Sequence, residues 1–338
     1  YPKKTIFEKL KIASSKNIKN KRIKDDVDFY LNIYKSYKNI EPKNKFEFNK
    51  KNIFIKYNSK SSQFILKPIW GITRKFNNSG FHQHLYGGIS AEYILNNNWA
   101  VYANLRDNTM NFASALPNYF TDEYGGNYKQ WLQNDFSEMK GGITYSFNSG
   151  SIGFIKEHIE WGDNYFGSNI LSGRSPSFPM IKFHKILNKY IELNYLHAWL
   201  VSEDIDSAMS YISSSGNYRA IFRDKYLASN FFTLNISNFS KFSFGNSIIY
   251  GDINGVHPSY LVPFFFYKSI DHSLNHNIEN QNSQIFINFS SREIKHLHLF
   301  TSIFIDEFNK DRLFNDSLNN FISSKIGFNL SNWPINNL

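Results

Sequence analysis

The histidines of the sequence include two closely spaced pairs that could bind a metal ion. His82 and His84 are separated by one residue, and so are His296 and His298. Residues with this spacing point to the same side of a β-strand, as the ligands of a metal site must. No Asp or Glu stands at matching spacing beside either pair. We therefore expect ordinary lumen or interface histidines, with no metal ion and no cofactor.

Hydrolytic chemistry has no local signature in this sequence. A catalytic serine needs a histidine and an orienting acid or amide close to it. The chain contains no GxSxG, HExxH or CxxC motif and no glycine-rich phosphate loop. We expect no enzymatic activity. The pairs Gly87-Gly88 and Gly141-Gly142 fall within expected strands and indicate bulges or kinks where a barrel bends.

Polysaccharide binding is the chemistry that the long segment 108–135 could perform. Sugars are held by flat aromatic side chains together with amides and carboxylates that give direction. The segment supplies both kinds, and its aromatic candidates are Tyr119, Tyr124, Tyr128 and Trp131. The alternative is a loop that folds over the end of the sheet on its own aromatic residues. Surface polysaccharide or lipopolysaccharide is the partner that we expect.

One cation stands in a stretch that is otherwise almost neutral. Arg174 lies between Gly173 and Ser175 and could pair with an acidic sugar or with an internal carboxylate such as that of Glu160. The internal pair is favoured, because a charge that is removed from water needs a partner.

The stretch 151–185 indicates which elements would position these groups. It begins as a strand, continues as a loop rich in Gly, Asn and Ser, and returns as a second strand. Because side chains alternate along a strand, one side of the first arm carries apolar residues and the other ionisable ones. The apolar set is Ile155, Ile159 and Trp161, and the ionisable set is Lys156, His158 and Glu160. The pattern is typical of a transmembrane barrel strand, and equally of a half-buried strand in a soluble sandwich.

Two blocks of the sequence resemble the capsule-assembly Wzi family of outer-membrane barrels, in its Bacteroidetes forms. The first contains IEWG at 159–162 and SPSFP at 175–179, and the second is the block 244–272 with YGD and YLVPFFF. The resemblance covers roughly 141–289. It implies a non-enzymatic barrel of up to eighteen strands, with a helical element beneath it, that binds or organises capsular polysaccharide. It also implies a set of polar lumen and motif residues, namely Lys156, His158, Glu160, Trp161, Gly162, Ser175, Pro176, Tyr250, Gly251 and Asp252.

The composition agrees with an envelope barrel. Aromatic residues make up 18% of the chain, with 21 Tyr and 33 Phe, which suits aromatic girdles at two membrane interfaces. A nucleotide bias towards Phe and Tyr codons is the alternative. The chain has no cysteine, so no disulfide stabilises it.

The net charge of +10 is concentrated at one end. Residues 1–60 hold 17 Lys/Arg and 6 Asp/Glu, whereas the remainder holds 21 and 22. The barrel-like part is therefore close to neutral, and we expect no nucleic-acid partner. The basic arm is a solvated charged segment or touches anionic lipid or a partner protein.

No apolar run approaches the roughly 18–20 residues that a membrane helix needs. A membrane protein with this sequence would have to be a closed barrel, because only helices and barrels satisfy their backbone groups in lipid. The chain begins at Tyr1 without a recognisable signal peptide, and we expect a processed or trimmed form.

The chain is expected to begin with helices and to continue as strands. Helices are predicted over 3–14 and 25–38, so that 1–45 forms a basic helical segment on the periplasmic side and 46–338 forms the barrel. Strands are predicted at 46–57, 63–70, 85–95, 99–107, 136–147, 151–161, 178–186, 189–201, 226–236, 239–250, 283–289, 294–306 and 321–330.

The connections between these strands alternate between short and long. Outer-membrane barrels show this order, because tight turns face the periplasm and long loops face outward. The pattern predicts an all-β, antiparallel, transmembrane β-barrel of about 14–18 strands in the bacterial outer membrane, with a short N-terminal helical element. The ending SNWPINNL lacks the usual terminal aromatic residue, which indicates an atypical closing strand or a truncated chain.

Two further functions are compatible with such a barrel. One is a structural subunit of a larger outer-membrane complex, in which the arm 1–60 binds other outer-membrane proteins. The other is a diffusion porin.

Overall fold

A computed structural model describes most of the chain, in two compact units. The residues that it describes are 3–16, 18, 21–34, 45–49, 53–78, 80–110, 129–130, 134–162, 165, 167–251, 255–274, 281–306 and 321–331. Unit 1 comprises 1–158, 174–177 and 337, and unit 2 comprises 159–173, 178–336 and 338.

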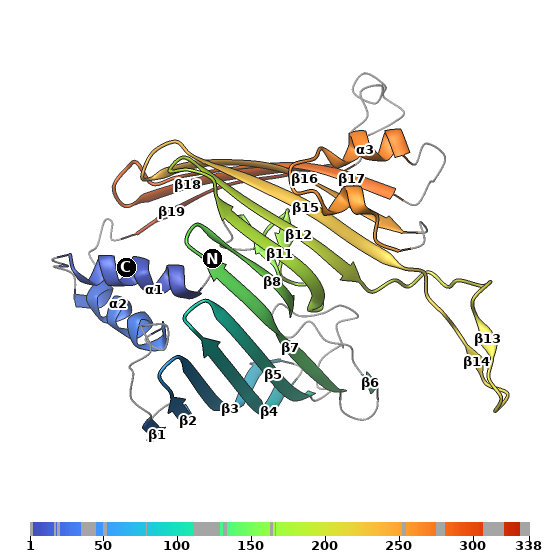
Figure 1. The fold of residues 1–338 in the computed structure, drawn as a ribbon, viewed down its shortest axis with the longest axis horizontal. Coiled ribbons are helices and arrows are strands. Elements are labelled where there is room, and N and C mark those ends of the chain that lie inside the picture. The colour runs from blue at the N-terminus through green and yellow to red at the C-terminus, as the bar shows by residue number, and fades with distance from the viewer. Residues whose placement is uncertain are drawn as a thin grey trace. The chain divides into compact units, whose positions relative to one another are not determined.

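Unit 1 consists of two helices followed by an antiparallel sheet (Figure 1). The helices are α1 (Lys3–Ser14) and α2 (Lys21–Tyr34), which pack against each other. The strands pair in sequence order, with the short β6 (Lys129–Gln130) added beside β7. They are β1 (Lys45–Asn49), β2 (Ile53–Asn58), β3 (Ser62–Asn77), β4 (Gly80–Leu95), β5 (Trp99–Met110), β7 (Asn134–Phe147) and β8 (Gly150–Glu157).

Unit 2 is also an antiparallel sheet whose strands pair in sequence order. They are β11 (Phe178–Ile186), β12 (Ile191–Leu200), β15 (Lys225–Asn235), β16 (Ser240–Gly251), β17 (Gln281–Ser291), β18 (Leu297–Asp306) and β19 (Phe321–Leu330). Its connections contain two small hairpins, a 3-10 turn and a helix. These are β9 (Glu160–Trp161) with β10 (Leu171–Ser172), β13 (Tyr211–Ile212) with β14 (Tyr218–Arg219), η2 (Pro258–Leu261) and α3 (Tyr267–Leu274).

The prediction of an antiparallel β protein with a short N-terminal helical element is confirmed. In the ladders that the structure describes, β1 pairs only with β2 and β19 pairs only with β18. Both are therefore edge strands, and no pairing between them closes a barrel. Among the described residues, no helix is both long enough and apolar enough to cross a membrane.

The tight turns fall where the sequence predicts them. The turn between β4 and β5 is built on Asn96 and Asn97, which adopt φ angles of 49° and 59°. Asparagine tolerates this left-handed conformation better than most residues, so the Asn triplet stops one strand and starts the next. Short turns also join β7 to β8, β11 to β12 and β15 to β16.

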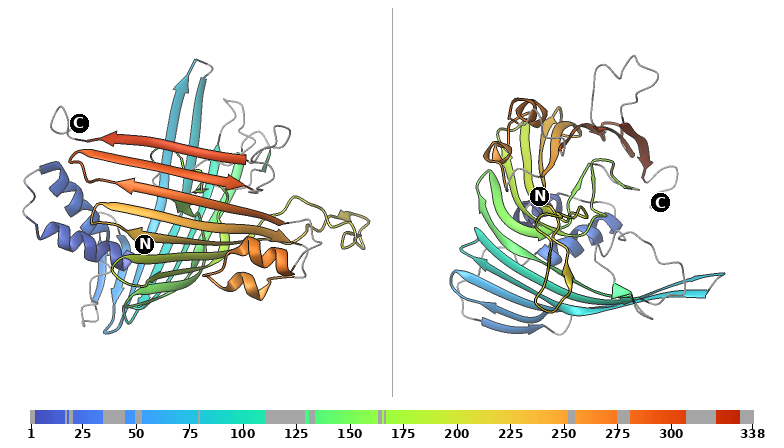
Figure 2. Two further views of the ribbon diagram at one scale, coloured as in Figure 1. Left: turned by 90° about the horizontal axis from the view of Figure 1, so that it is seen from above. Right: turned by 90° about the vertical axis from the view of Figure 1, so that its right-hand side faces the viewer.

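Two predicted strand boundaries are wrong. The expected connection 71–84 is strand, because β3 and β4 are 16 residues each and form a long hairpin that extends past β5 (Figure 2). The alternation of exposed apolar residues simply continues through Trp70, Ile72 and Phe76. The expected single strand 46–57 is instead the pair β1 and β2.

The two faces of the unit 1 sheet differ in an unusual way. One row across four strands consists of Tyr93, Val101, Ile143 and Phe154, and these side chains are 39–54% exposed. The opposite face carries the ionic pair Arg106 and Glu138. We call the first the apolar face and the second the polar face of unit 1. The apolar side chains are the exposed ones, and the Glu138 carboxylate is the shielded one.

Unit 2 repeats this arrangement. Its apolar face carries the cross-strand row Phe232, Phe244, Ile287 and Ile303, of which the last three are 37–42% exposed. The next row, on the polar face, is Thr233, Ser243, Asn288 and Ser302, and all four are buried. Both sheets therefore expose hydrocarbon and shield polar groups, which reverses the usual order in water.

Glycine allows close approach of strands in unit 1, without the predicted bulges. The ladders run without a register shift through Gly87–Gly88 and Gly141–Gly142, so the expectation of bulges there is wrong. A Cβ at Gly88 would lie 2.0 Å from the Leu105 carbonyl oxygen, and Gly142 has a φ of 157° with the Phe154 oxygen 2.4 Å from its Cβ position. Side chains at these positions would push neighbouring strands apart.

The predicted division of the stretch 151–161 agrees with the burial, because Lys156 and His158 are half-buried and Glu160 is exposed, but the predicted strand is too long. The structure exposes Ile152 and Phe154, whereas Ile155, Ile159 and Trp161 are buried. Strand β8 ends at Glu157, and the chain restarts as β9 at Glu160, so the side-chain alternation is interrupted between them. A two-residue break of this kind leaves no mark in the hydrophobic pattern.

Candidate functional site

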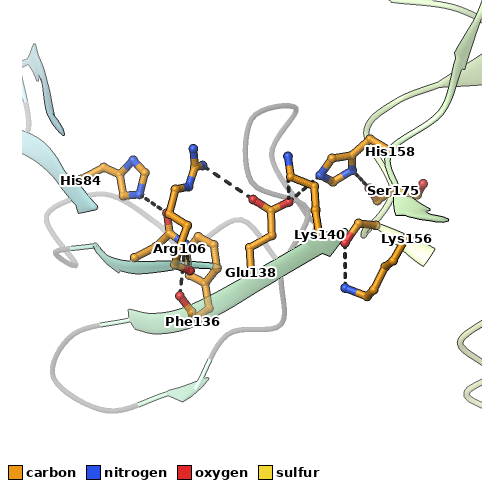
Figure 3. Close-up of polar contacts among 10 residues, drawn as sticks. His84, Arg106, Phe136, Glu138, Lys140, Lys156, His158 and Ser175 are labelled. Carbon is orange, nitrogen blue, oxygen red and sulfur yellow. Dashed lines mark hydrogen bonds and ion pairs between the residues drawn. The ribbon is translucent and has the colours of Figure 1, made fainter. Parts of the chain in front are cut away.

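The polar face of unit 1 holds a cluster of charged side chains around Glu138 (Figure 3). The Glu138 carboxylate lies 3.9 Å from Arg106 Nη2, 3.7 Å from Lys140 Nζ and 2.6 Å from His158 Nε2. Its side chain is 3% exposed, whereas those of Arg106 and Lys140 are about a fifth exposed. A carboxylate this shielded needs such partners, because removing an isolated charge from water is costly.

Neighbouring strands bring these groups together by register. Arg106 on β5 is directly opposite Glu138 on β7, and Lys140 is two residues further along the same face of β7. Side chains at directly opposite positions are close enough to interact across the ladder.

His158 completes the cluster from the end of β8. Its Nδ1 lies 2.9 Å from the backbone oxygen of Ser175, and its Nε2 faces the Glu138 carboxylate. Both neighbours are acceptors unless the carboxyl group carries a proton. The His158 ring is therefore held between Glu138 of β7 and the connection 174–177.

Lys156 also holds the connection 174–177, by a hydrogen bond to Ser177. Lys156 Nζ donates to the backbone oxygen of Met139 at 2.7 Å and to Ser177 Oγ at 2.9 Å. Ser175 and Arg174 are exposed and Pro176 is half-buried. The motif SPSFP therefore supplies the backbone oxygen that orients His158. The prediction that Arg174 pairs with Glu160 stays a prediction.

A further polar pair lies beside the cluster on the same face. His84 Nε2 is 3.1 Å from Asn108 Oδ1, and the Asn108 amide donates to the Phe136 carbonyl oxygen at 3.2 Å. The His84 ring stacks on Phe136 with a centroid distance of 6.3 Å. These contacts give His84 a structural role.

The first family-like block also forms a loop on the polar face of unit 2. We call residues 159–173 the motif loop. Trp161 stacks on Phe231 at 5.2 Å, and Tyr165 Oη bonds to His298 Nδ1 at 2.9 Å. Asn169 accepts a hydrogen bond from Ser302 Oγ at 2.6 Å, and Lys325 Nζ donates to the Gly167 oxygen. Gly162, with a φ of 106°, makes the turn after Trp161.

The remaining predicted site residues do not join either group. Tyr250 and Gly251 lie in β16, and the Tyr250 ring is on the apolar face of unit 2, in a buried tyrosine cluster. Asp252 lies outside the described residues, as do all the polysaccharide candidates of the segment 108–135, namely Tyr119, Tyr124, Tyr128 and Trp131.

The histidine pairs form no metal site in the part of the chain that the structure describes. No group of three His, Cys, Asp or Glu residues is close enough there to hold an ion. His298 bonds to Tyr165, Ser290 and Arg292. The side chain of His82 lies outside the described residues.

The sequence analysis missed Arg106, Glu138 and Lys140. A signal was present, because Glu138 and Lys140 are two residues apart in a predicted strand and therefore share a face. Arg106 belongs to the same face only through the register of β5 on β7. The hydrophobic pattern of one strand does not give that register.

No family profile matches the chain, and no curated protein matches it. Among solved structures, it is similar to a NanC porin at 9% identity and a TM-score of 0.26, over 80% of this chain and 94% of the porin chain. It is similar to a Pseudomonas aeruginosa FadL homologue at 10% identity and a TM-score of 0.34, over 80% and 74%.

A third similar structure is the outer membrane channel DcaP of Acinetobacter baumannii, at 10% identity and a TM-score of 0.35, over 81% and 82% of the two chains. These identities and TM-scores are too low to assign the chain to a family. None of the three is described as a Wzi or capsule-assembly protein, so that resemblance stays a prediction.

Proposed function

We propose that this chain is a non-enzymatic β-barrel of the bacterial outer membrane with a polar lumen. The observation that carries the proposal is the reversed polarity of both sheets. The apolar row Tyr93, Val101, Ile143 and Phe154 is exposed. The Glu138 carboxylate and the polar row of unit 2 are shielded, and that row consists of Thr233, Ser243, Asn288 and Ser302. Lipid on the apolar face and water on the polar face satisfy both.

In a soluble sandwich, the apolar rows would remain exposed to water and the polar groups would remain shielded from it, and both are unfavourable. Each exposed side chain of the apolar rows forgoes about 25 cal/mol for every Å² that it leaves in water. A soluble protein also rarely exposes a continuous apolar patch that crosses several strands. In a membrane the same rows contact acyl chains, and the ionic groups face the lumen.

We further propose that the lumen passes small hydrophilic solutes and favours anions. Arg106 and Lys140 both lie beside the Glu138 carboxylate, so two formal positive charges face one negative charge in the cluster. A ring or row of cationic side chains in a pore raises the local concentration of anions.

Planar-bilayer recording tests this function. Purified protein should give conductance steps, and a salt gradient should give a reversal potential on the anion-selective side. The double variant Arg106→Gln with Lys140→Gln should move that potential towards cation selectivity. Absence of conductance in well-inserted wild-type protein would refute the channel.

A second function, the holding of surface polysaccharide, is favoured by the motif loop. This loop covers part of the polar face of unit 2 with Trp161 and Tyr165, which suits an obstructed lumen rather than an open one. An obstructed barrel predicts no conductance, together with retention of capsular polysaccharide in a pull-down. Conductance without retention would refute this second function.

A further inference from the structure

A segment of unit 2 outside the strands covers part of the apolar face. We call residues 255–274 the strap, which contains η2 and α3 and lies beside β16 and β17 (Figure 1). Two of its side chains, Tyr260 and Tyr267, are completely buried. They pack on apolar-face residues of the sheet, namely Tyr195, Tyr226, Ile248 and Tyr250.

The strap follows the sheet closely. The rings of Tyr250 and Tyr260 are 4.5 Å apart between centroids, and Tyr195 Oη donates to the Tyr260 carbonyl oxygen at 2.9 Å. The Tyr260 hydroxyl bonds in turn to Gln281 at 3.2 Å. The strap is therefore packed in a fixed position on the outer side of the strands.

Two asparagines on the apolar face hold the backbone of the strap. Asn230 Nδ2 donates to the Phe265 carbonyl oxygen at 2.8 Å, and the Tyr267 N–H donates to Asn246 Oδ1 at 2.9 Å. Asn246 also donates to Asn230 Oδ1 at 2.8 Å. Amides in an apolar row are costly unless satisfied, and here the strap supplies their missing partners.

The exposed residues of the strap include five large apolar side chains, besides Ser269, His272 and Ser273. Phe264, Phe265 and Phe266 are 61%, 42% and 45% exposed. Leu261 and Leu274 are 40% and 50% exposed. The strap is packed on the apolar face of the sheet, where Phe244 and Ile287 are also exposed.

We propose that the strap is a lipid-facing element, and that Phe264, Phe265 and Phe266 contact the acyl chains near the membrane surface. The inference rests on the proposed membrane location of the sheet. A segment that is fixed on a lipid-facing sheet and exposes phenylalanines meets the same lipid as the sheet. Aromatic residues at the edge of the bilayer anchor a barrel at a defined depth.

Single cysteines provide a clean test, because the chain has none of its own. An environment-sensitive fluorophore is attached to Phe264→Cys in the full chain, in phosphatidylcholine vesicles that carry a spin label near the headgroup or near the chain end. Phe154→Cys on the apolar face of unit 1 is the lipid control. Ile212→Cys on the β13–β14 hairpin, 72% exposed, is the water control.

The fluorophore at position 264 should lose as much intensity as the one at 154, with stronger quenching by the shallow label, and the one at 212 should lose none. Quenching at 154 without quenching at 264 would overturn the inference and leave the membrane proposal intact. Protection of position 264 from both lipid and aqueous quenchers would mean that a protein covers the strap, which also overturns it. Absence of quenching at 154 would refute the proposed function itself. Leu261→Cys repeats the test if Phe264→Cys does not fold.

Discussion

Nε2 of His158 lies 2.6 Å from Oε1 of Glu138, and Nδ1 of the same ring lies 2.9 Å from the Ser175 backbone oxygen. Within unit 1, the end of β8 is thereby tied to β7 and to the connection 174–177. The contact joins a residue of the family-like stretch to a cluster that the sequence patterns did not reveal. We expect this cluster to contribute to the stability of the protein and to the ion selectivity of the proposed channel.

Loss of the Glu138 carboxylate should destabilise the protein strongly. Glu138→Ala leaves Arg106, Lys140 and His158 without their shared counter-charge, and we expect a loss of about 3 kcal/mol in the free energy of unfolding. The value is at the lower end for a buried ion pair because Arg106 and Lys140 remain about a fifth exposed. Urea unfolding in lipid vesicles measures it.

The matched control for that variant is Glu203→Ala, which removes an exposed carboxylate. We expect a change within about 0.5 kcal/mol for this surface position. Equal unfolding midpoints for the two variants would show that the cluster around Glu138 is not a stabilising unit.

Truncation of Trp161 should release the motif loop from the polar face of unit 2. The ring stacks on Phe231 and contacts Phe286, and it is 7% exposed, so Trp161→Ala should cost about 3–5 kcal/mol. If the loop narrows a channel, single-channel conductance should also rise. Trp70→Ala, at a 79% exposed position, should leave conductance unchanged. Equal conductance in all three proteins would exclude the loop as a constriction.

Removal of one strap-holding amide should loosen the strap without unfolding the sheet. Asn246→Ala removes the acceptor of the Tyr267 N–H and leaves Asn230 partly unsatisfied. A cost of about 1–2 kcal/mol corresponds to a roughly tenfold rise in the detached state. Chymotrypsin should then cut at Phe264–Phe266 about tenfold faster. Asn217→Ala, in the β13–β14 turn, is the control, and equal cutting rates would contradict the role of Asn246.

A lysine on the apolar face separates a membrane protein from a soluble one. Leu105 is 45% exposed, so Leu105→Lys would cost almost nothing in water. In lipid near the bilayer centre we expect a loss of about 2–4 kcal/mol. Asn104→Lys, on the polar face of the same strand, should be much milder. Unfolding in vesicles compares them, and a Leu105→Lys protein as stable as wild type would count against lipid contact.

The fold was predictable from the sequence where local chemistry decides it. The Asn96-Asn97 turn and the helix 3–14 were predicted correctly, because turn propensity and helical periodicity are local. The end of β8 at Glu157 was not, since the break between Glu157 and Glu160 leaves the hydrophobic pattern unchanged. The hairpin β3–β4 was missed because the strands pair as far as Asn77 and Gly80, where the sequence predicts the connection 71–84.

The site was predictable only in part. His158 was named as a polar residue of the first arm, but its partner Glu138 is 20 residues away in the chain and depends on sheet register. The Asn230 and Asn246 amides looked like ordinary strand residues. Their role follows from the position of a connecting segment on the apolar face, which no strand pattern contains.

The most direct test of the central claim is a single-cysteine scan along β5 in native membranes with a membrane-impermeant thiol reagent. The odd positions Val101, Ala103 and Leu105 are the exposed ones, and the even positions Tyr102 and Asn104 are partly shielded. If lipid covers the apolar face and water fills the lumen, cysteines at the even positions should react and those at the odd positions should not. The opposite pattern, with fast labelling at 101, 103 and 105, would contradict the account.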